Sequence, residues 1–313
     1  MKVFIDGSVG TTGLMLEERL RARRDVSILR IDDGSRKDRD AKKAVMDEAD
    51  VIFLCLPDDA ARESAAMASE DKLVIDASTA HRAAPGWVYG LPELSAERRR
   101  AIRLSKRIAV PGCHASGFTS MVFPMTASGL LHTSAHVNCV SLTGYSGGGR
   151  SLIDTYESGR TPADALKAPR PYALGLTHKH LPEMQAQSGL EHAPHFYPVC
   201  GDMAQGMLVS VHLWADQFTK SVGPEAVWEI LATHYAGSRF IRVMPLGADA
   251  PLDNGFLDPT ACNGTNRMEI FVFGHERQIL LAARLDNLGK GASGAAVQCM
   301  NIACGLDEQT GLE

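Results

Sequence analysis

The sequence predicts two domains of different class, a doubly wound α/β domain followed by an α+β domain. In the N-terminal third, short apolar runs alternate with charged, helix-like segments, which is typical of a parallel sheet covered by helices on both faces. From Val137 onward, strand-like runs follow one another across longer polar connections, which indicates a largely antiparallel sheet. The chain has 313 residues, which at roughly 150 residues per domain accommodates both.

The first domain is predicted from a regular alternation of strands and helices. Strands are expected at residues 3–5, 26–31, 51–56, 73–76 and 107–110. Helical or charged segments are expected between them, at residues 14–24, 36–47, 60–69 and 95–106. A helix over 116–131, apolar and without a proline before Pro124, is expected to lead into the second domain.

The second domain is predicted from five strand-like runs and a single helix. The strands are expected at residues 137–145, 207–214, 239–243, 268–273 and 278–285, and the helix at 225–235. The final stretch, 291–305, is rich in small residues and is expected to form a helix that returns to the first domain.

Composition excludes several classes of protein. Hydrophobic residues make up 45% and charged residues 22%, as in ordinary globular proteins. The 32 Lys and Arg residues face 37 Asp and Glu residues, so the net charge of -5 gives no basic footprint for nucleic acid. No run approaches the roughly 18 apolar residues of a membrane span, and the N-terminus enters a strand without a leader.

The seven cysteines point to a reducing compartment. They are odd in number and contain no CxxC pair, which disfavours a disulfide scaffold or a zinc finger. A cytoplasmic protein is therefore expected. By default, the cysteines other than Cys113 are expected to be inert packing residues.

A glycine-rich turn follows the first strand and precedes the first helix. Its spacing is G-x-x-G-x-x-G, and its residues are Gly7, Ser8, Val9, Gly10, Thr11, Thr12 and Gly13. Glycines let the backbone approach a ligand closely, and the N-terminus of the helix attracts the pyrophosphate of a dinucleotide. The turn is therefore predicted to bind a dinucleotide, with a tight structural turn as the alternative.

The end of the second strand leaves the choice of dinucleotide open. Asp32 stands where an acidic residue holds the ribose hydroxyls of NAD. Ser35, Arg36 and Lys37 follow it, and these side chains suit the 2′-phosphate of NADP. The two basic residues also fit the solvated start of a helix.

Cys113 is the candidate nucleophile. It follows Pro111 and Gly112, which fix a turn, and it opens a segment that is expected to be helical. A thiol at the N-terminus of a helix is stabilised as the thiolate, which is the nucleophilic form.

Two histidines, His178 and His180, lie in a polar connection of the second domain and are candidates for proton transfer or substrate binding. Together with Glu183 they also have a metal-ligand spacing, but no third His or Cys stands at a supporting spacing. Surface histidines are the remaining alternative. The glycine-rich loop of Ser146 and Arg150 suits an anionic substrate group, or is a mobile hairpin end.

Six segments together resemble one family. They are GSVGTTG, HRAAPGWVYGLPEL, AVPGCHASGF, SLTGYSGGGRS, HKHLPEM and DNLGKGASGAAVQCMN. In this order they are similar to the N-acetyl-gamma-glutamyl-phosphate reductases of arginine biosynthesis, in their shorter form, which are related to aspartate-semialdehyde dehydrogenase. Longer members carry an aromatic residue and a proline where this chain has His114, Ala115 and Ser116, so no role is assigned to His114.

The resemblance implies a Rossmann-type NADP-binding domain, residues 1–115 completed by a C-terminal helix at 290–313, and a catalytic and oligomerisation domain, 116–289. It implies Cys113 as the catalytic cysteine, and His178 and His180 as the acid/base and substrate residues. It places Asn287, Lys290 and Gly291 near the nicotinamide.

The activity implied is the NADPH-dependent reduction of an acyl phosphate, N-acetyl-gamma-glutamyl phosphate, through a cysteine thioester. A homodimer or homotetramer without nucleic-acid or membrane partners is expected. The alternatives are reduction of another acyl phosphate, such as aspartyl phosphate, an inactive nucleotide-sensing protein of the same fold, and a metal hydrolase that uses His178 and His180.

Overall fold

The computed structural model describes residues 1–35, 38–247 and 251–312, so the predicted cofactor contact Arg36 and its neighbour Lys37 lie outside the described residues. The chain forms two compact units. Unit 1 contains the residues up to Gly112 and the C-terminal segment from Ala292, and unit 2 runs from Cys113 to Gly291. The functional assignment of the two units as a cofactor domain and a catalytic domain stays a prediction.

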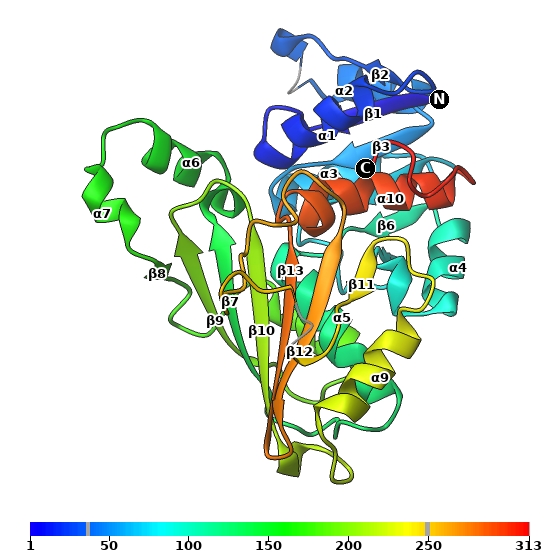
Figure 1. Ribbon diagram of the computed structural model, residues 1–313. Helices are drawn as coiled ribbons and strands as arrows, with labels where there is room; N and C mark the ends of the chain where they lie inside the picture. Colours follow the sequence, from blue (N-terminus) through cyan, green and yellow to red (C-terminus); the bar gives the residue numbers. More distant parts are fainter. Residues whose placement is uncertain (36–37, 248–250, 313) are drawn as a thin grey trace. The chain divides into compact units, whose positions relative to one another are not determined.

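Unit 1 is built on a six-stranded sheet in the order β2-β1-β3-β4-β6-β5 (Figure 1). Its strands are β1 (Lys2–Asp6), β2 (Ser27–Leu29), β3 (Val51–Leu54), β4 (Leu73–Asp76), β5 (Val88–Tyr89) and β6 (Arg107–Ala109). Every pair is parallel, which confirms the predicted sheet. The two-residue strand β5 was not expected, because its surroundings are rich in turn-forming residues.

Among the described residues, five α-helices belong to unit 1. They are α1 (Thr11–Arg21), α2 (Arg39–Glu48), α3 (Asp58–Met67), α4 (Ala96–Leu104) and α10 (Gly294–Ala303). Met46 of α2 and Met67 of α3 pack with Phe4, Ile52 and Val74 of the sheet in one apolar cluster. Burial of these side chains, rather than helix propensity, holds the short helices in place.

The C-terminal helix α10 completes unit 1. It contacts α1, α4 and β4 (Figure 1). The guanidinium of Arg23 donates to Asn301 Oδ1 at 2.6 Å, and Cys299 Sγ donates to the carbonyl of Gly90 at 3.3 Å. Glycine at position 90 allows this close approach, since a Cβ there would lie 2.9 Å from Cys299 Sγ.

Unit 2 is built on a seven-stranded sheet in the order β11-β12-β13-β10-β7-β9-β8 (Figure 1). Its strands are β7 (Asn138–Gly144), β8 (Arg170–Pro171), β9 (His195–Gly201), β10 (Met207–Trp214), β11 (Ile241–Val243), β12 (Met268–His275) and β13 (Gln278–Leu285). The sheet is mixed. Four pairs are antiparallel, and the pairs β7–β9 and β11–β12 are parallel.

Helix α5 (Cys113–Ala127) forms the centre of the core of unit 2. Phe118, Met121 and Met125 are fully buried, and Gly117 lies against Val209 of β10, where a Cβ would meet the valine at 2.7 Å. A helix that is apolar on all sides must be enclosed by other elements. The prediction of its start at residue 116 was three residues late, because the helix begins directly at the cysteine.

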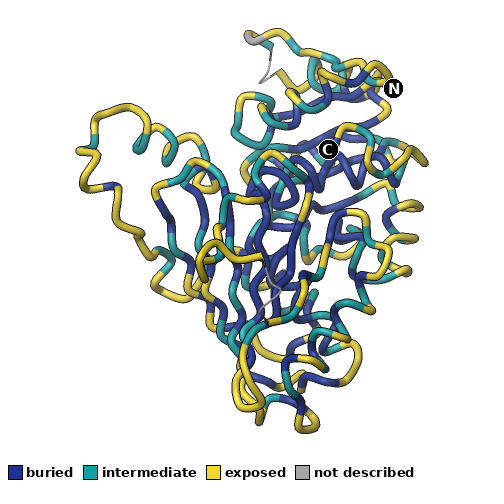
Figure 2. The backbone as a smooth tube through the Cα atoms, in the orientation of Figure 1, coloured by how far each residue is buried: buried dark blue, intermediate teal, exposed yellow. Residues whose placement is uncertain are grey.

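The prediction of one helix in the second domain was wrong. Besides α9 (Pro224–His234), unit 2 contains α6 (Gly149–Glu157), α7 (Ala163–Lys167) and α8 (Leu181–Ser188). Helix α6 buries no residue fully, and its residues are half-buried or exposed (Figure 2). Strand β9 was also missed, because Pro198 interrupts its pattern. No helix of the described residues is long and apolar enough to cross a bilayer.

Candidate functional site

The glycine-rich turn in unit 1 depends on two of its three glycines. Gly7 has a φ of +91°, and a Cβ there would lie 2.3 Å from the carbonyl oxygen of Cys55. A Cβ at Gly13 would lie 2.3 Å from the carbonyl oxygen of Gly7. At Gly10 the nearest atom is 3.5 Å away, an ordinary contact. The first and third glycines are therefore required for packing, whereas the second is not.

The turn stands where an α/β sheet binds ligands. Strand β1 pairs with β2 on one side and with β3 on the other, so the strand order reverses at β1. Gly10 is the N-cap of α1 and offers no side-chain cap, and Thr11 and Thr12 form the first turn with half-buried side chains. The half-buried Ser8 lies in the same turn. This backbone cradle fits the pyrophosphate of a dinucleotide.

Asp32 and Ser35 come together after β2. The carbonyl oxygen of Asp32 accepts the N–H of Ser35 at 2.9 Å, in the turn that precedes α2. Asp32 is exposed and Ser35 is half-buried. The geometry therefore places the candidate ribose ligand and a candidate 2′-phosphate ligand in one turn.

A polar cluster at the end of β4 was missed by the sequence analysis. Asp76 is fully buried and accepts hydrogen bonds from Ser78 Oγ at 2.7 Å and from the backbone N–H of Ser78 at 2.8 Å. Its carboxylate also meets His81 Nδ1 at 2.6 Å, and the His81 ring stacks on Trp87 with centroids 4.0 Å apart. The sequence signal for this cluster was the acidic residue Asp76 at the end of an apolar strand.

Cys113 occupies the first position of α5 in unit 2 and is half-buried. The helix N-terminus is a favourable place for a thiolate. A π-helical turn, Gly289–Ser293, passes beside it, and a Cβ at Gly291 would lie 2.7 Å from Cys113 Cβ. Gly291 is thus required by the close approach of this turn to the cysteine. Single π-turns are frequent at functional sites.

Three histidines gather around the cysteine. A ring nitrogen of His114, one of His180 and the Cys113 sulfur all lie within 4.8 Å of one another. The ring centroids of His178 and His180 are 4.7 Å apart, and that of His114 is 5.5 and 5.4 Å from them. The fold therefore brings Cys113 close to the pair His178 and His180, which follows it by more than sixty residues in the sequence.

His114 is the residue that the sequence analysis left without a role. Its Nδ1 meets Ser141 Oγ at 2.7 Å and its Nε2 meets the hydroxyl of Tyr172 at 2.9 Å. Burial, reinforced by His178 and Lys179, lowers the pKa of His114 from 6.5 to about 3. The ring is therefore neutral at physiological pH and serves as a hydrogen-bonded support within the cluster. The same burial raises the pKa of Tyr172 above its ordinary value.

The backbone of the His178–His180 segment fixes one tautomer. The N–H of His180 donates to His178 Nδ1 at 3.1 Å, so a neutral His178 carries its proton on Nε2. His180 is buried and caps the N-terminus of α8, and Glu183 is buried one turn later. The segment was predicted as a polar connection, whereas the pair leads directly into a helix.

Asn287, which is predicted to lie near the nicotinamide, lies beside Ser146, which is predicted to bind the substrate. Asn287 Nδ2 donates to Ser146 Oγ at 2.9 Å, and Asn287 Oδ1 accepts the N–H of Gly206 at 3.0 Å. Both side chains are buried. Lys290 is also fully buried, and its ammonium group lies 5.8 Å from the centre of the Phe240 ring.

Arg150 lies apart from these contacts. The segment predicted as a mobile hairpin end is a 3-10 turn, Tyr145–Gly148, that continues into α6, so this alternative was wrong. Arg150 is the second residue of α6 and is exposed. Across residues 1–35, 38–247 and 251–312, its side chain makes no hydrogen bond or ion pair.

The donor set at the cysteine could hold a soft metal ion. One thiolate and two imidazoles are ligands that Zn²⁺ prefers. No third His or Cys stands at a supporting spacing from His178 and His180 in the sequence, but Cys113 and His114 join His180 in space. The expectation of a metal-free site itself stays a prediction.

The other cysteines differ from Cys113 in their surroundings. Burial, together with Asp76 and Asp6, raises the pKa of Cys55 to about 12, and burial raises that of Cys262 to about 11. These thiols are not activated as nucleophiles. All seven cysteines are free, and Cys304 is exposed, so the default of six packed cysteines was wrong for that residue.

Two family models match consecutive parts of the chain. The one described as semialdehyde dehydrogenase, NAD binding domain, matches residues 2–102, and the one described as semialdehyde dehydrogenase, dimerisation domain, matches residues 113–287. Between them they cover the β1–α1 turn, the cysteine and all three clustered histidines.

Named relatives match along nearly the whole chain. The chain is 43% identical over 318 residues to N-acetyl-gamma-glutamyl-phosphate reductase 2 of Nostoc sp., with 99% of each chain covered. It is 42% identical over 307 residues to the enzyme of the same name from Pseudomonas putida, with 97% of this chain and 96% of the relative covered.

Solved structures share the fold at low sequence identity. Aspartate semialdehyde dehydrogenase II of Vibrio cholerae, complexed with ASA, superposes with a TM-score of 0.71 at 17% identity over 97% of this chain and 98% of that one. The aspartate semialdehyde dehydrogenase of Candida albicans with NADP gives a TM-score of 0.62 at 14% identity, over 96% and 97%. These likenesses show the fold.

Proposed function

The chain is a member of the N-acetyl-gamma-glutamyl-phosphate reductases, a group of the semialdehyde dehydrogenase family, and from this premise we propose that it reduces N-acetyl-gamma-glutamyl phosphate with NADPH. The products are N-acetyl-L-glutamate 5-semialdehyde and phosphate. The observation that carries the proposal is the Cys113 sulfur at the start of α5, within 4.8 Å of a His180 ring nitrogen.

The first step is acyl transfer to the cysteine. The Cys113 thiolate attacks the acyl carbon, a C–S bond forms, and phosphate leaves with the electron pair of the C–O bond. The positive end of the α5 dipole supports the thiolate before the attack. The covalent thioester divides one difficult step into two easier ones.

The cofactor is proposed to bind at the turn between β1 and α1. The backbone at Gly7, Gly10 and Gly13, with Ser8, Thr11 and Thr12, holds the pyrophosphate, and Ser35 and Arg36 hold the 2′-phosphate. Asn287, Lys290 and Gly291 are assigned to the nicotinamide end. When bound, NADPH supplies a hydride to the carbonyl carbon of the thioester.

The second step needs one proton at the former carbonyl oxygen. We assign its donation to His180, because a nitrogen of this ring lies within 4.8 Å of the Cys113 sulfur. The thiohemiacetal then collapses: its C–S bond breaks toward sulfur, its hydroxyl proton returns to His180, and the aldehyde is released. His178, with its proton on Nε2, is suited to donate a hydrogen bond to the substrate.

The remaining predicted residues are assigned to substrate binding. The guanidinium of Arg150 suits an anionic group of the substrate through a forked pair of hydrogen bonds. The Ser146 hydroxyl and the Glu183 carboxylate supply polar contacts to the rest of the molecule. Their burial beside Asn287 and His180 supports this assignment.

A homo-oligomer is part of the proposal. The matched dimerisation-domain model spans residues 113–287. Val140, Tyr197 and Trp214 are exposed on strands of the unit 2 sheet, and such apolar surface is typical of subunit contacts. We propose a homodimer or homotetramer in the cytoplasm, where the seven free thiols stay reduced.

The function is tested by one spectrophotometric assay in the aldehyde-oxidising direction. Purified protein receives N-acetyl-glutamate semialdehyde, phosphate and NADP, and the absorbance of NADPH is followed. We expect NADPH to form only when all three are present. The unacetylated aspartate semialdehyde is the control substrate, and faster turnover of that compound contradicts the proposal in favour of an aspartate-semialdehyde dehydrogenase.

A further inference from the structure

The side chains around Cys113 form a set of converging soft ligands. The Cys113 sulfur, a ring nitrogen of His114 and one of His180 all lie within 4.8 Å of one another. Across residues 1–35, 38–247 and 251–312, no other group of three or more His, Cys, Asp or Glu side chains converges in this way. All three residues belong to unit 2.

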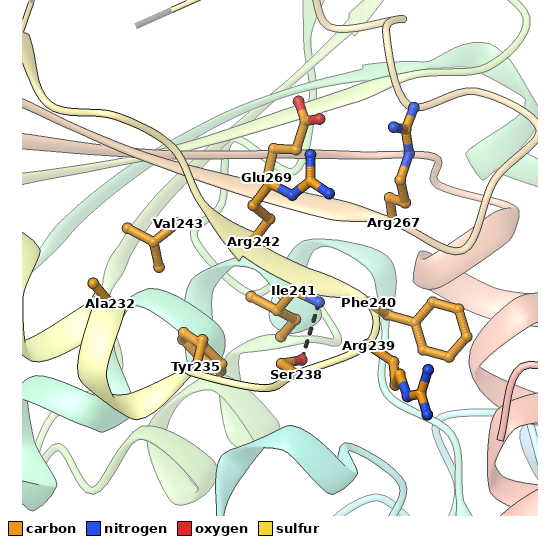
Figure 3. Close-up of a pocket in the computed structure, with 10 residues that line it drawn as sticks. All are labelled: Ala232, Tyr235, Ser238, Arg239, Phe240, Ile241, Arg242, Val243, Arg267 and Glu269. Carbon is orange, nitrogen blue, oxygen red and sulfur yellow. Dashed lines mark hydrogen bonds between the residues drawn. The ribbon is translucent and has the colours of Figure 1, made fainter. Parts of the chain in front are cut away.

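A cavity elsewhere in unit 2 lacks such convergence. It has a volume of about 260 Å³ and is lined by residues of α9, β11 and β12 and by their connections (Figure 3). Its exposed Arg239 and Arg267 point away from each other (Figure 3). The carboxylate of Glu269 accepts a hydrogen bond from Arg284 Nε at 2.6 Å. The polar groups of this cavity therefore do not meet at one point, in contrast to the ligands around Cys113.

The separations within the cluster suit a zinc ion. Zn²⁺ binds thiolate sulfur at about 2.3 Å and imidazole nitrogen at about 2.0 Å with tetrahedral angles, so its sulfur and nitrogen ligands lie about 3.5 Å apart. From separations of at most 4.8 Å, side-chain shifts on the order of 1 Å reach this value. Three protein ligands leave the fourth position to water, as in open zinc sites.

His114 is oriented through both of its ring nitrogens. Nδ1 meets Ser141 Oγ at 2.7 Å, and Nε2 meets the Tyr172 hydroxyl at 2.9 Å. When one nitrogen binds the ion, the other keeps its hydroxyl partner. A metal-bound histidine almost always has such a partner on its other nitrogen, which fixes the orientation of the ring. Zinc therefore replaces one hydrogen bond of His114 and retains the other.

The surroundings of the cluster are ordered on one side and accessible on the other. His180 is buried, and its backbone N–H donates to His178 Nδ1 at 3.1 Å. The buried Phe196 ring packs beside His114, with ring centroids 5.1 Å apart. Cys113 is only half-buried, which leaves the sulfur accessible from solvent. An ion can therefore enter at the cysteine and meet imidazoles that are already in place.

From these observations we infer that Cys113, His114 and His180 bind Zn²⁺ reversibly, and that the zinc-bound protein is inactive. Zinc binds the sulfur as the thiolate, the thiol proton passes to solvent, and the lone pair that attacks the acyl carbon is engaged by the ion. No electron is transferred, so a chelator restores the thiol. The active form is the metal-free one. The inhibition rests on the proposed role of Cys113, whereas the binding of zinc does not.

A cobalt titration tests the binding without reference to turnover. Protein that has been treated with EDTA and kept reduced is titrated with Co²⁺, which occupies zinc sites and gives a near-ultraviolet charge-transfer band when it is bound to a thiolate. We expect saturation at one Co²⁺ per chain and loss of the band when Zn²⁺ is added. Cys113→Ala is expected to abolish the band. Zn²⁺ should also slow the alkylation of Cys113 by iodoacetamide, and EDTA should restore the rate.

His114→Phe removes one ligand without removing the nucleophile. We expect at least about tenfold weaker binding of Co²⁺, because the loss of even a hydrogen-bond partner of a ligand costs about 10- to 100-fold in metal affinity. Half-inhibition of the oxidation assay should require at least about tenfold more free Zn²⁺, measured relative to the variant's own uninhibited rate. A nitrilotriacetate buffer sets the free Zn²⁺, so that the phosphate of the assay does not deplete it.

The matched control is His192→Phe. It breaks an exposed pair of stacked histidines, His136 and His192, whose ring centroids lie 4.7 Å apart. This variant is expected to bind Co²⁺ and to be inhibited by Zn²⁺ as the wild type is, which separates the cluster from histidines on the surface. Circular dichroism establishes that each variant is folded. His180→Gln supplies the same cobalt comparison if His114→Phe does not fold.

The inference is overturned if the wild type shows no cobalt–thiolate band, if folded His114→Phe binds Co²⁺ as the wild type does, or if His192→Phe weakens binding as much. It is also overturned if Zn²⁺ displaces Co²⁺ but leaves turnover unchanged. A cobalt–thiolate band without any oxidation of N-acetyl-glutamate semialdehyde refutes the proposed function and supports the metal site. Oxidation of that substrate without a band refutes the metal site alone.

Discussion

The turn between β1 and α1 and the cluster around Cys113 are built in opposite ways. The turn is one continuous segment, and its properties come from the backbone: Gly7 and Gly13 fit only because they have no Cβ. The cluster is assembled from side chains of α5, β7 and the segment before α8, and Gly291 of the π-helical turn packs against the cysteine. Unit 1 thus offers backbone N–H groups, which do not change their protonation state. Unit 2 offers a thiol and imidazoles, whose protonation state determines what they can do.

This difference determines how a substitution damages each region. A methyl group added at Gly7 or Gly13 meets backbone atoms that cannot move aside, so the damage is steric and affects folding and binding together. A side chain exchanged in the cluster leaves the backbone in place, so the damage arises from the chemical groups that are lost.

Cys113→Ala is the substitution with the largest expected effect on turnover. Without the thiol no thioester forms, and we expect the phosphate-dependent reduction of NADP to fall by at least about 10⁴-fold. The affinity for NADP, measured by fluorescence titration, is expected to stay unchanged, because the turn belongs to unit 1.

The matched control for this variant is Cys55→Ala, which removes a thiol whose pKa is raised to about 12. It is expected to keep its turnover. Substantial activity in Cys113→Ala, or loss of activity in Cys55→Ala beyond that explained by unfolding, contradicts the division of roles between the two cysteines.

Gly7→Ala is the steric counterpart in unit 1. Its methyl group would lie 2.3 Å from the Cys55 carbonyl oxygen, on a backbone with a φ of +91°. We expect the free energy of unfolding to fall by about 2–4 kcal/mol and NADP binding to be lost in the protein that remains folded. Thermal or urea unfolding and NADP titration measure the two effects.

Gly10→Ala is its control within the same turn. The nearest atom to the added methyl group is 3.5 Å away, so we expect a cost below about 1 kcal/mol and retained NADP binding. Equal damage from the two substitutions would show that the pattern of three glycines, rather than the contacts of each one, determines the site.

The fold and the turn could be predicted because their signals are local. The alternation of apolar and charged segments placed β4 and β10 at their observed bounds, and the turn is contiguous in sequence. Helix α6 and strand β9 were missed because the first is short and buries no residue fully, and the second contains Pro198. Their positions depend on tertiary contacts.

The cluster could be predicted only in part, for the same physical reason. Cys113 could be predicted from the Pro-Gly turn before it, and His178 and His180 could be predicted as a pair from their spacing. No sequence pattern identifies His114, because its partners Ser141 and Tyr172 come from β7 and from a loop. Long-range packing, rather than spacing, makes it part of the site.

Gly291→Ala tests whether backbone packing also matters in unit 2. The added methyl group would lie 2.7 Å from Cys113 Cβ, so either the π-helical turn or the cysteine must shift. A displacement on the order of 1 Å at a nucleophile costs about 10²-fold in rate, and we expect a loss of this size in kcat/KM. The rate of Cys113 alkylation by iodoacetamide should change in parallel, while NADP binding at the β1–α1 turn is kept. An unchanged alkylation rate would separate Gly291 from the cysteine.

His114→Phe is expected to change the pH dependence of stability rather than turnover. In the folded protein the pKa of His114 is lowered from 6.5 to about 3, so below pH 6.5 the unfolded chain binds a proton that the folded chain does not. The stability linked to this residue is fully present above pH 6.5 and is lost as the pH falls toward 3, by up to about 1.4 kcal/mol per pH unit.

The phenylalanine variant should therefore show a shallower decrease of the free energy of unfolding between pH 6.5 and 4, whatever its stability at neutral pH. Ser141→Ala is the control, because it removes the hydrogen bond to His114 Nδ1 but keeps the titrating ring. If a purely structural role is correct, both variants lower stability by a constant amount at every pH. If only His114→Phe changes the slope of the free energy of unfolding against pH, the His114 ring is held neutral in the folded protein. The stability of unit 2 then depends on the protonation of a side chain, whereas the backbone turn of unit 1 does not.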